Sequence, residues 1–340
     1  MRRGLMAWDA EEIPVEALHE RTRRLLAEMV NADQDAIILY TNFIRSAAVS
    51  YLTAFSPYWA DGVLLVPREG EPVFATTLSK RVGEWIQTVK PVGGLLTSPT
   101  PAKVLGEILA EKKARRVSIL ELDAFPSGLY QELVGAAPGV EIVDGTDVFA
   151  KARVIDDVER RLMKRADAIA RGALDGIFVM RAETAGEIVG AVEKAARMMG
   201  TEEVYVAIAS NLDSDRRFAR VSGPKPLGSR YAVRATVAYK GVWSRSIKTS
   251  SQSKEDRISI GRADIWFEAL LAALDPGRPL DEQIATALPV GAKFAGWTAE
   301  GPVGTRPLAA SASSSAPVVG VSLDIGGMPW CGAGLAQRRA

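Results

Sequence analysis

The most constraining feature of the sequence is the regular alternation, over its first 143 residues, of short apolar runs with segments of helical spacing. The first helical stripe is formed by Leu18, Thr22, Leu25 and Met29, and it follows Pro14, a residue that suits the first turn of a helix. Strands are expected at 35–40, 63–66, 72–75, 117–120 and 140–143, the second and third forming a hairpin. Further helices are expected near 102–113 and 128–134. This alternation predicts an α/β domain with a mixed sheet.

The second half of the chain combines long amphipathic helices with an antiparallel sheet. An apolar stripe from Leu162 to Met180 predicts a long helix, and Thr184 with Glu187 forms the capping box of the next one. Strands are expected at 204–209, 231–239 and 242–249, helices at 266–274 and 281–288, and a mobile surface loop at 311–315. The strict alternation in 231–239 places Tyr231 and Arg234 on opposite faces of its strand. We therefore expect two domains, residues 1–152 and 153–340.

Two single residues exclude several kinds of chemistry. His19 is the only histidine, and we expect it on the exposed side of the first helix. A zinc site with two or three histidines is therefore impossible, and a Ser-His-Asp or Cys-His triad lacks its usual base. Cys331 is the only cysteine, which excludes an intramolecular disulfide, and we expect its thiol to be inert.

The balance of charges gives no general attraction for a charged polymer. Forty-two Lys and Arg residues against 41 Asp and Glu leave a formal charge of +1, so we expect neither nucleic acid nor a membrane surface as a partner. No apolar run approaches the length of a membrane span, and we expect a cytoplasmic protein. The small numbers of Asn, Gln and Cys are typical of a thermophilic source.

The order of segments from about Leu18 to Gly334 resembles the creatinase, prolidase and aminopeptidase P family of M24 peptidase-like proteins. The resemblance rests on the segments 35–55, 151–173, 237–241 and 270–280. It implies a creatinase-type N-terminal α/β domain with ribonuclease H-like topology, followed by an α+β domain of the pita-bread fold that is degenerate and shortened at its C-terminal end. It also implies assembly as a homodimer.

The same resemblance implies that the metal ligands of the family are missing. The family holds two metal ions with two aspartates, a histidine and two glutamates. This chain has Arg234 and Arg245 at the two positions that correspond to the aspartates, and no histidine follows His19. Asp324 resembles the first glutamate motif, and the second glutamate would fall near residues 337–338. Because a guanidinium does not coordinate a cation, we expect a metal-free homologue of Xaa-Pro dipeptidase without another cofactor, inactive as a metallopeptidase.

Basic side chains from neighbouring segments suggest what replaced the metal. We expect a cleft that binds a small anionic or peptide-like ligand and that is lined by Arg217, Arg220, Arg234, Arg245 and Lys248, with Arg216 close by. The alternative for the same cations is an internal ion network with the surrounding carboxylates of Asp213, Asp215, Glu300 and Asp324.

Two other functions stay open at the level of sequence. The first is a metal-independent hydrolase of a small amide or amidine, acting on a C–N bond as the metal-free family member creatinase does. Its acid or base would be a carboxylate, for which Asp324 and Glu300 are the candidates. The second is a non-catalytic scaffold that binds other proteins.

Overall fold

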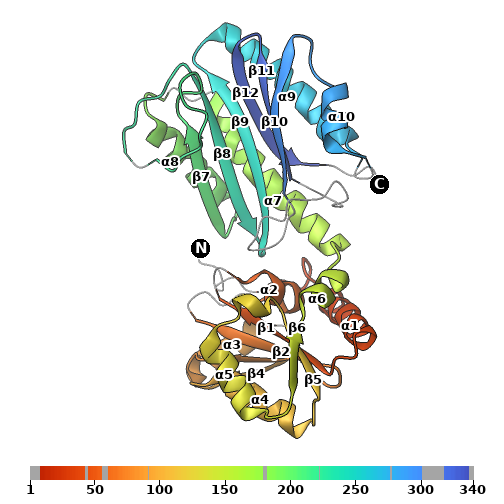
Figure 1. The fold of residues 1–340 in the computed structure, drawn as a ribbon. Coiled ribbons are helices and arrows are strands. Elements are labelled where there is room, and N and C mark those ends of the chain that lie inside the picture. Colours follow the sequence, from red (N-terminus) through yellow and green to blue (C-terminus); the bar gives the residue numbers. More distant parts are fainter. Residues whose placement is uncertain are drawn as a thin grey trace. The chain divides into compact units, whose positions relative to one another are not determined.

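The computed structural model of the chain describes residues 8–42, 45–55, 60–90, 92–178, 182–221, 223–275, 278–300 and 318–336. The contacts divide the chain after Val158, into units Arg2–Val158 and Glu159–Ala340, each with its own sheet (Figure 1). No helix in the described part of the chain is long and apolar enough to cross a membrane.

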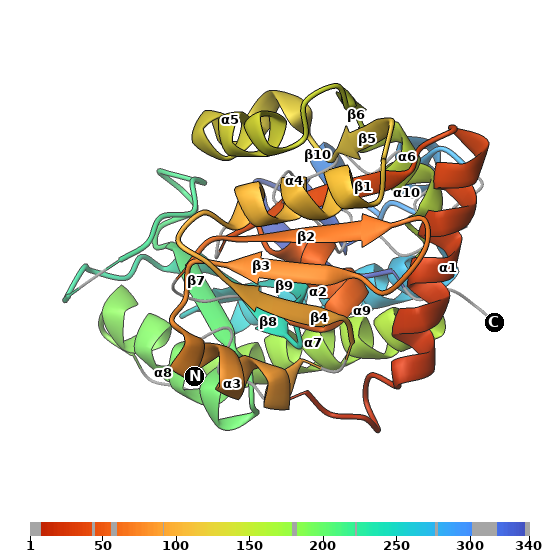
Figure 2. The ribbon, with the colours of Figure 1, turned by 90° about the horizontal axis from the view of Figure 1, so that it is seen from below.

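The N-terminal unit contains a mixed six-stranded sheet in the order β4-β3-β2-β1-β5-β6. The strands are β1 (Ala36–Thr41), β2 (Gly62–Pro67), β3 (Val73–Thr76), β4 (Gly94–Thr97), β5 (Arg116–Ile119) and β6 (Glu141–Asp144). Strands β1, β2 and β3 are joined antiparallel, and the other pairs are parallel. Figure 2 shows β2, β3 and β4 side by side. All five strands expected from the sequence are present, and β4, a short strand without a fully buried residue, was not expected.

Helices cover both faces of this sheet, because its buried strands carry apolar side chains on both faces. They are α1 (Val15–Asn31), α2 (Ala47–Thr53), α3 (Lys80–Val89), α4 (Pro101–Glu111), α5 (Ser127–Ala136) and α6 (Thr146–Ala152), with a short 3₁₀ turn, η1 (Leu122–Ala124). Ile37 and Leu39 pack against α1, α2, α3 and α6, whereas Ile38 packs against α4 and α5. His19 lies on the exposed side of α1, as expected.

The segment after α6 belongs with the N-terminal unit, so the units divide after Val158 and not at the expected boundary of 152. Asp156 accepts two hydrogen bonds from the buried Arg21, at 2.6 and 2.9 Å. The hydroxyl of Tyr51 donates to the carbonyl of Val154 at 3.0 Å. These bonds tie residues 154–156 to α1 and α2.

The C-terminal unit contains an antiparallel six-stranded sheet in the order β10-β11-β12-β9-β8-β7. The strands are β7 (Glu203–Ala209), β8 (Arg230–Tyr239), β9 (Val242–Ser251), β10 (Ala292–Glu300), β11 (Val318–Ile325) and β12 (Met328–Leu335). The helices are α7 (Asp157–Asp175), α8 (Ala185–Met198), α9 (Lys254–Ala273) and α10 (Leu280–Thr286), with a 3₁₀ turn, η2 (Gly176–Phe178), after α7. The architecture is that of an α+β pita-bread domain.

All four helices pack against one face of this sheet. Helices α7 and α8 cover β7 and β8, and helices α9 and α10 cover β10, β11 and β12. The opposite face carries Arg234, Arg245 and Asp324. We call it the arginine face.

Two elements of this unit lie where local sequence signals predicted them. Thr184 and Glu187 form the expected capping box, with bonds of 3.2 and 3.3 Å. Lys240 and Gly241 both have positive φ angles, of 48° and 79°, as the expected two-residue hairpin requires. The three C-terminal strands were not expected. The expected loop 311–315 lies outside the described residues.

Candidate ligand site on the arginine face

The register of β8 and β9 brings two of the expected arginines to the same face of the sheet. Arg234 pairs with Ile247 and Arg245 pairs with Thr236, so the two arginines are diagonal neighbours on adjacent strands. Both side chains are half-buried. The Nε of Arg245 donates to the hydroxyl of Thr236 at 3.2 Å.

Aromatic rings contact two of the guanidinium groups. Arg234 lies over the ring of Phe218, 5.2 Å from its centroid. Arg220 lies over Tyr205 at 4.5 Å, and the Tyr205 ring is in turn stacked on Trp243 with centroids 5.6 Å apart. Stacking uses the flat face of a guanidinium, whereas recognition of a carboxylate uses its edge.

Lys248 and Arg217 do not join this group. Lys248 pairs with Val233 on the helix-covered face, because neighbouring residues of a strand point to opposite faces, and its ammonium contacts Asp175 at 2.5 Å. Arg217 is 90% exposed and forms a two-pronged pair with Asp215 of its own loop. The hydrogen bonds from Arg217 lower the pKa of Asp215 to about 2.

Two of the expected ion pairs form around the edge of the arginine face. Arg216 lies 3.9 Å from Asp324, and Arg217 pairs with Asp215. Arg230 was not among the residues expected from the sequence. It forms ion pairs with Asp213 at 2.9 Å and with Asp256 at 2.8 Å. Arg230 lies four residues before Arg234 in the same strand, and this even spacing already predicts that both arginines lie on the same face of the sheet.

The two candidate catalytic residues, Asp324 and Glu300, lie at opposite ends of the β10–β11 pairing. Asp324 accepts a hydrogen bond from the backbone N–H of Gly327 at 2.8 Å and so caps the turn between β11 and β12. Glu300 pairs in register with Val318, at the other end of β11. The side chain of Glu300 lies outside the described residues, as do positions 337–338.

Metal-binding side chains do not gather on this face in the described part of the chain. No group of three or more His, Cys, Asp or Glu residues that would hold a metal ion occurs there. Cys331, which lies on the arginine face opposite Ser322, is buried, and this burial raises the pKa of its thiol to about 11. Its partner is the hydroxyl of Thr249.

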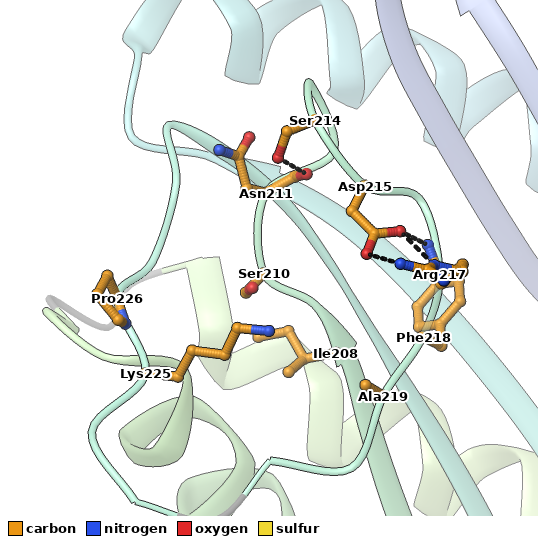
Figure 3. A pocket seen from close by; sticks show the side chains of 10 residues that line it. All are labelled: Ile208, Ser210, Asn211, Ser214, Asp215, Arg217, Phe218, Ala219, Lys225 and Pro226. Atoms are coloured by element: carbon orange, nitrogen blue, oxygen red, sulfur yellow. Dashed lines mark hydrogen bonds and ion pairs between the residues drawn. The ribbon is translucent and has the colours of Figure 1, made fainter.

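A pocket of about 540 Å³ lies beside this face, between β7 and the segment 210–228 (Figure 3). Phe218 lines the pocket and also contacts Arg234. The polar lining residues include Ser210, Lys225 and the Asp215–Arg217 pair. The pocket was not expected from the sequence.

The chain matches a known domain family over its N-terminal unit. Residues 21–155 match the creatinase/prolidase N-terminal domain. No curated protein sequence matches the chain.

Solved structures share the fold over almost the whole chain. A Xaa-Pro dipeptidase from Bacillus anthracis superposes with a TM-score of 0.67 at 19% identity. A prolidase from Pyrococcus horikoshii gives 0.67 at 18%, and an X-Pro aminopeptidase from Thermotoga maritima gives 0.68 at 17%. Each alignment covers 93% of both chains. At this level of identity, the likeness concerns the fold.

Proposed function

We propose that this chain, which carries a creatinase/prolidase N-terminal domain and the fold of Xaa-Pro dipeptidases, binds a small anionic or peptide-like ligand on its arginine face. In this proposal the chain has no dinuclear metal centre and is inactive as a metallopeptidase. Arg234, Arg245 and Arg220 hold the ligand, and Arg217 and Lys248 lie outside its direct reach.

The observation that carries the proposal is the placement of Arg234 and Arg245. They are diagonal neighbours on one face of the sheet, at the positions that the family resemblance assigns to the two aspartate ligands. Two guanidinium groups there repel divalent cations and favour anions. The described residues on this face do not fit a pair of metal ions, and this supports the metal-free interpretation.

The chemistry of the arginines favours an oxyanion such as a carboxylate over a simple halide. A guanidinium presents parallel N–H groups that match the two oxygens of a carboxylate. The contacts of Arg234 with Phe218 and of Arg220 with Tyr205 restrict the freedom of these groups before a ligand arrives. Such preorganisation reduces the entropy that binding costs.

The proposal is tested by calorimetric titration with succinate, a small dicarboxylate. Replacing both arginines, Arg234→Gln with Arg245→Gln, should weaken binding at least roughly tenfold, as expected for a lost charge-assisted bond. The matched control replaces two exposed arginines on α8 and α9, Arg197→Gln with Arg262→Gln, and should leave the affinity unchanged. Unchanged affinity of the first variant with a lower Tm would instead favour an internal ion network.

The absence of metallopeptidase activity is tested separately. The wild-type protein is incubated with Xaa-Pro dipeptides and small amides, with and without Mn²⁺, Co²⁺ or Zn²⁺, and product amino acids are measured. We expect no metal-dependent release, and no change of Tm on treatment with a chelator. Metal-stimulated hydrolysis would contradict the proposal, and metal-independent hydrolysis of an amide would favour the creatinase-like alternative. The homodimer and the cytoplasmic location stay predictions.

A further inference from the structure

Among the described residues, the pocket beside β7 has a lysine, Lys225, that forms no ion pair. Its charged lining residues are Asp215, Arg217 and Lys225. Asp215 and Arg217 neutralise each other through the two-pronged pair described above. Within the described residues, no carboxylate lies within ion-pair distance of the Lys225 ammonium, whose effect on Asp215 is the weakest of those that lower its pKa. The pocket therefore has a net charge of +1.

The Lys225 side chain is exposed at the rim of the pocket and extends from its loop toward Ile208 (Figure 3). Figure 3 shows its ammonium close to Ile208 and below Ser210. The hydroxyl of Ser210 makes no hydrogen bond with another described residue, and Ser210 is itself largely buried. An ammonium and a hydroxyl donor therefore face the same hollow, against an apolar wall that includes Ile208 and Phe218.

The backbone on each side of Lys225 is fixed to α8. The carbonyl of Lys225 accepts a hydrogen bond from the N–H of Ala185 at 2.8 Å, and Pro226 forms a β-bridge with Thr184. A Cβ atom at Gly186 would meet the carbonyl oxygen of Gly223 at 2.4 Å, so the loop packs directly on the helix. The base of the lysine is therefore anchored.

The opposite side of the pocket is tied to the sheet. Ala219 and Ile208 exchange two backbone hydrogen bonds, at 2.9 and 3.2 Å. The N–H of Gly228 donates to the carbonyl of Ser210 at 2.8 Å. A pocket anchored at both ends is preorganised for a ligand.

We infer that this pocket binds the carboxylate of a small acylated amino acid or peptide, with the ammonium of Lys225 as its ion-pair partner and the hydroxyl of Ser210 as a second donor. The apolar wall accepts the aliphatic part of such a ligand. This inference goes beyond the proposed function, because the lining of the pocket includes neither Arg234 nor Arg245.

The test compares two probes that differ only in the carboxylate. N-acetylglycine carries the anion, and N-acetylglycinamide replaces it with a neutral amide. Binding to the full-length protein is measured by calorimetry and by ¹⁵N chemical-shift changes. We expect N-acetylglycine to bind about tenfold more weakly to Lys225→Met than to wild type, whereas the amide should bind both proteins equally. The Lys254→Met variant, which removes an exposed lysine at the start of α9, is the matched control and should behave as wild type.

The results separate this inference from the proposed function. Equal binding of N-acetylglycine to Lys225→Met and wild type, or no binding to wild type, would overturn the inference, whatever the Arg234/Arg245 variant does with succinate. A Lys225-dependent binding of inorganic phosphate without binding of N-acetylglycine would also overturn the assignment to a carboxylate. Chemical-shift changes confined to residues 208–228 would support the pocket as the binding site.

Discussion

Asp167 on α7 and Leu335 at the end of β12 are joined by a hydrogen bond of 3.1 Å from the backbone N–H of Leu335 to the carboxylate. The same carboxylate accepts from Arg171 at 2.6 Å and from the hydroxyl of Ser244 on β9 at 3.3 Å. One buried side chain thus connects a helix with two neighbouring strands.

Replacing this carboxylate should strongly destabilise the C-terminal unit. Asp167→Ala leaves the largely buried guanidinium of Arg171 and the N–H of Leu335 without this partner, and the expected loss is about 3 kcal/mol in the free energy of unfolding. Urea denaturation measures it. The control is Asp175→Ala on the same helix, whose ion pair with Lys248 has an exposed carboxylate and is expected to contribute less than about 1 kcal/mol. Equal effects of the two variants would contradict this prediction.

The stability of the N-terminal unit should depend on the protonation of Lys90. Its ammonium is buried and donates to the carbonyls of Val92 and Gly93, and burial lowers its pKa to about 8 from an ordinary 10.5. Between these two values the folded state binds fewer protons than the unfolded state, so this group makes the free energy of unfolding increase as pH rises.

The Lys90→Met variant isolates this effect from other groups that titrate at alkaline pH. The wild type should gain stability relative to the variant from about pH 8 to about pH 10.5, by at most about 1.4 kcal/mol per pH unit. Denaturant titrations at several pH values measure the difference. A difference that is constant across this range would contradict the assignment.

Cys331 should not react with alkylating agents in the native protein. Its thiol is buried beside Thr249, and its pKa of about 11 leaves only about one thiolate in a thousand at pH 8. Iodoacetamide followed by mass spectrometry should detect no modification of the folded chain and one modified cysteine after denaturation. Rapid labelling of the folded chain would show that the arginine face opens at this point.

Arg230 should stabilise the segment that forms the pocket. Its guanidinium joins Asp213 in that segment to Asp256 at the start of α9, and both carboxylates raise its pKa further. Arg230→Lys keeps the charge but loses the two-pronged geometry, and we expect a loss of about 1–2 kcal/mol. The Arg217→Lys variant, in the same segment but at an exposed pair, should leave the urea midpoint unchanged.

The fold was predictable wherever a single period dominated the sequence. The stripe on α1, the alternation along β8 and the capping box of α8 each identified an element. Strands β11 and β12 were not expected from the sequence, because glycines interrupt the alternation of apolar and polar residues along them. Gly334 illustrates the reason: a Cβ atom there would lie 2.4 Å from Arg171 of α7, so the glycine serves a close approach that no local pattern reveals.

The candidate site was predictable only for residues whose side chains alternate between the two faces of a regular strand. Alternation along β8 and β9 accounts for Arg234 and Arg245 on one face, and it also sends Lys248 to the other. The pocket depends on the bridge of Ile208 with Ala219 and on the packing of the loop against α8. Such contacts between segments of irregular backbone have no periodic signature in the sequence.

The diagonal placement of Arg234 and Arg245 also determines what a single substitution on the arginine face would achieve. Changing either arginine alone to aspartate would leave the other guanidinium diagonally beside the new carboxylate, and the two would neutralise each other before a cation was bound. Anion binding and cation binding at these two positions therefore exclude each other, and no single substitution converts one kind of site into the other.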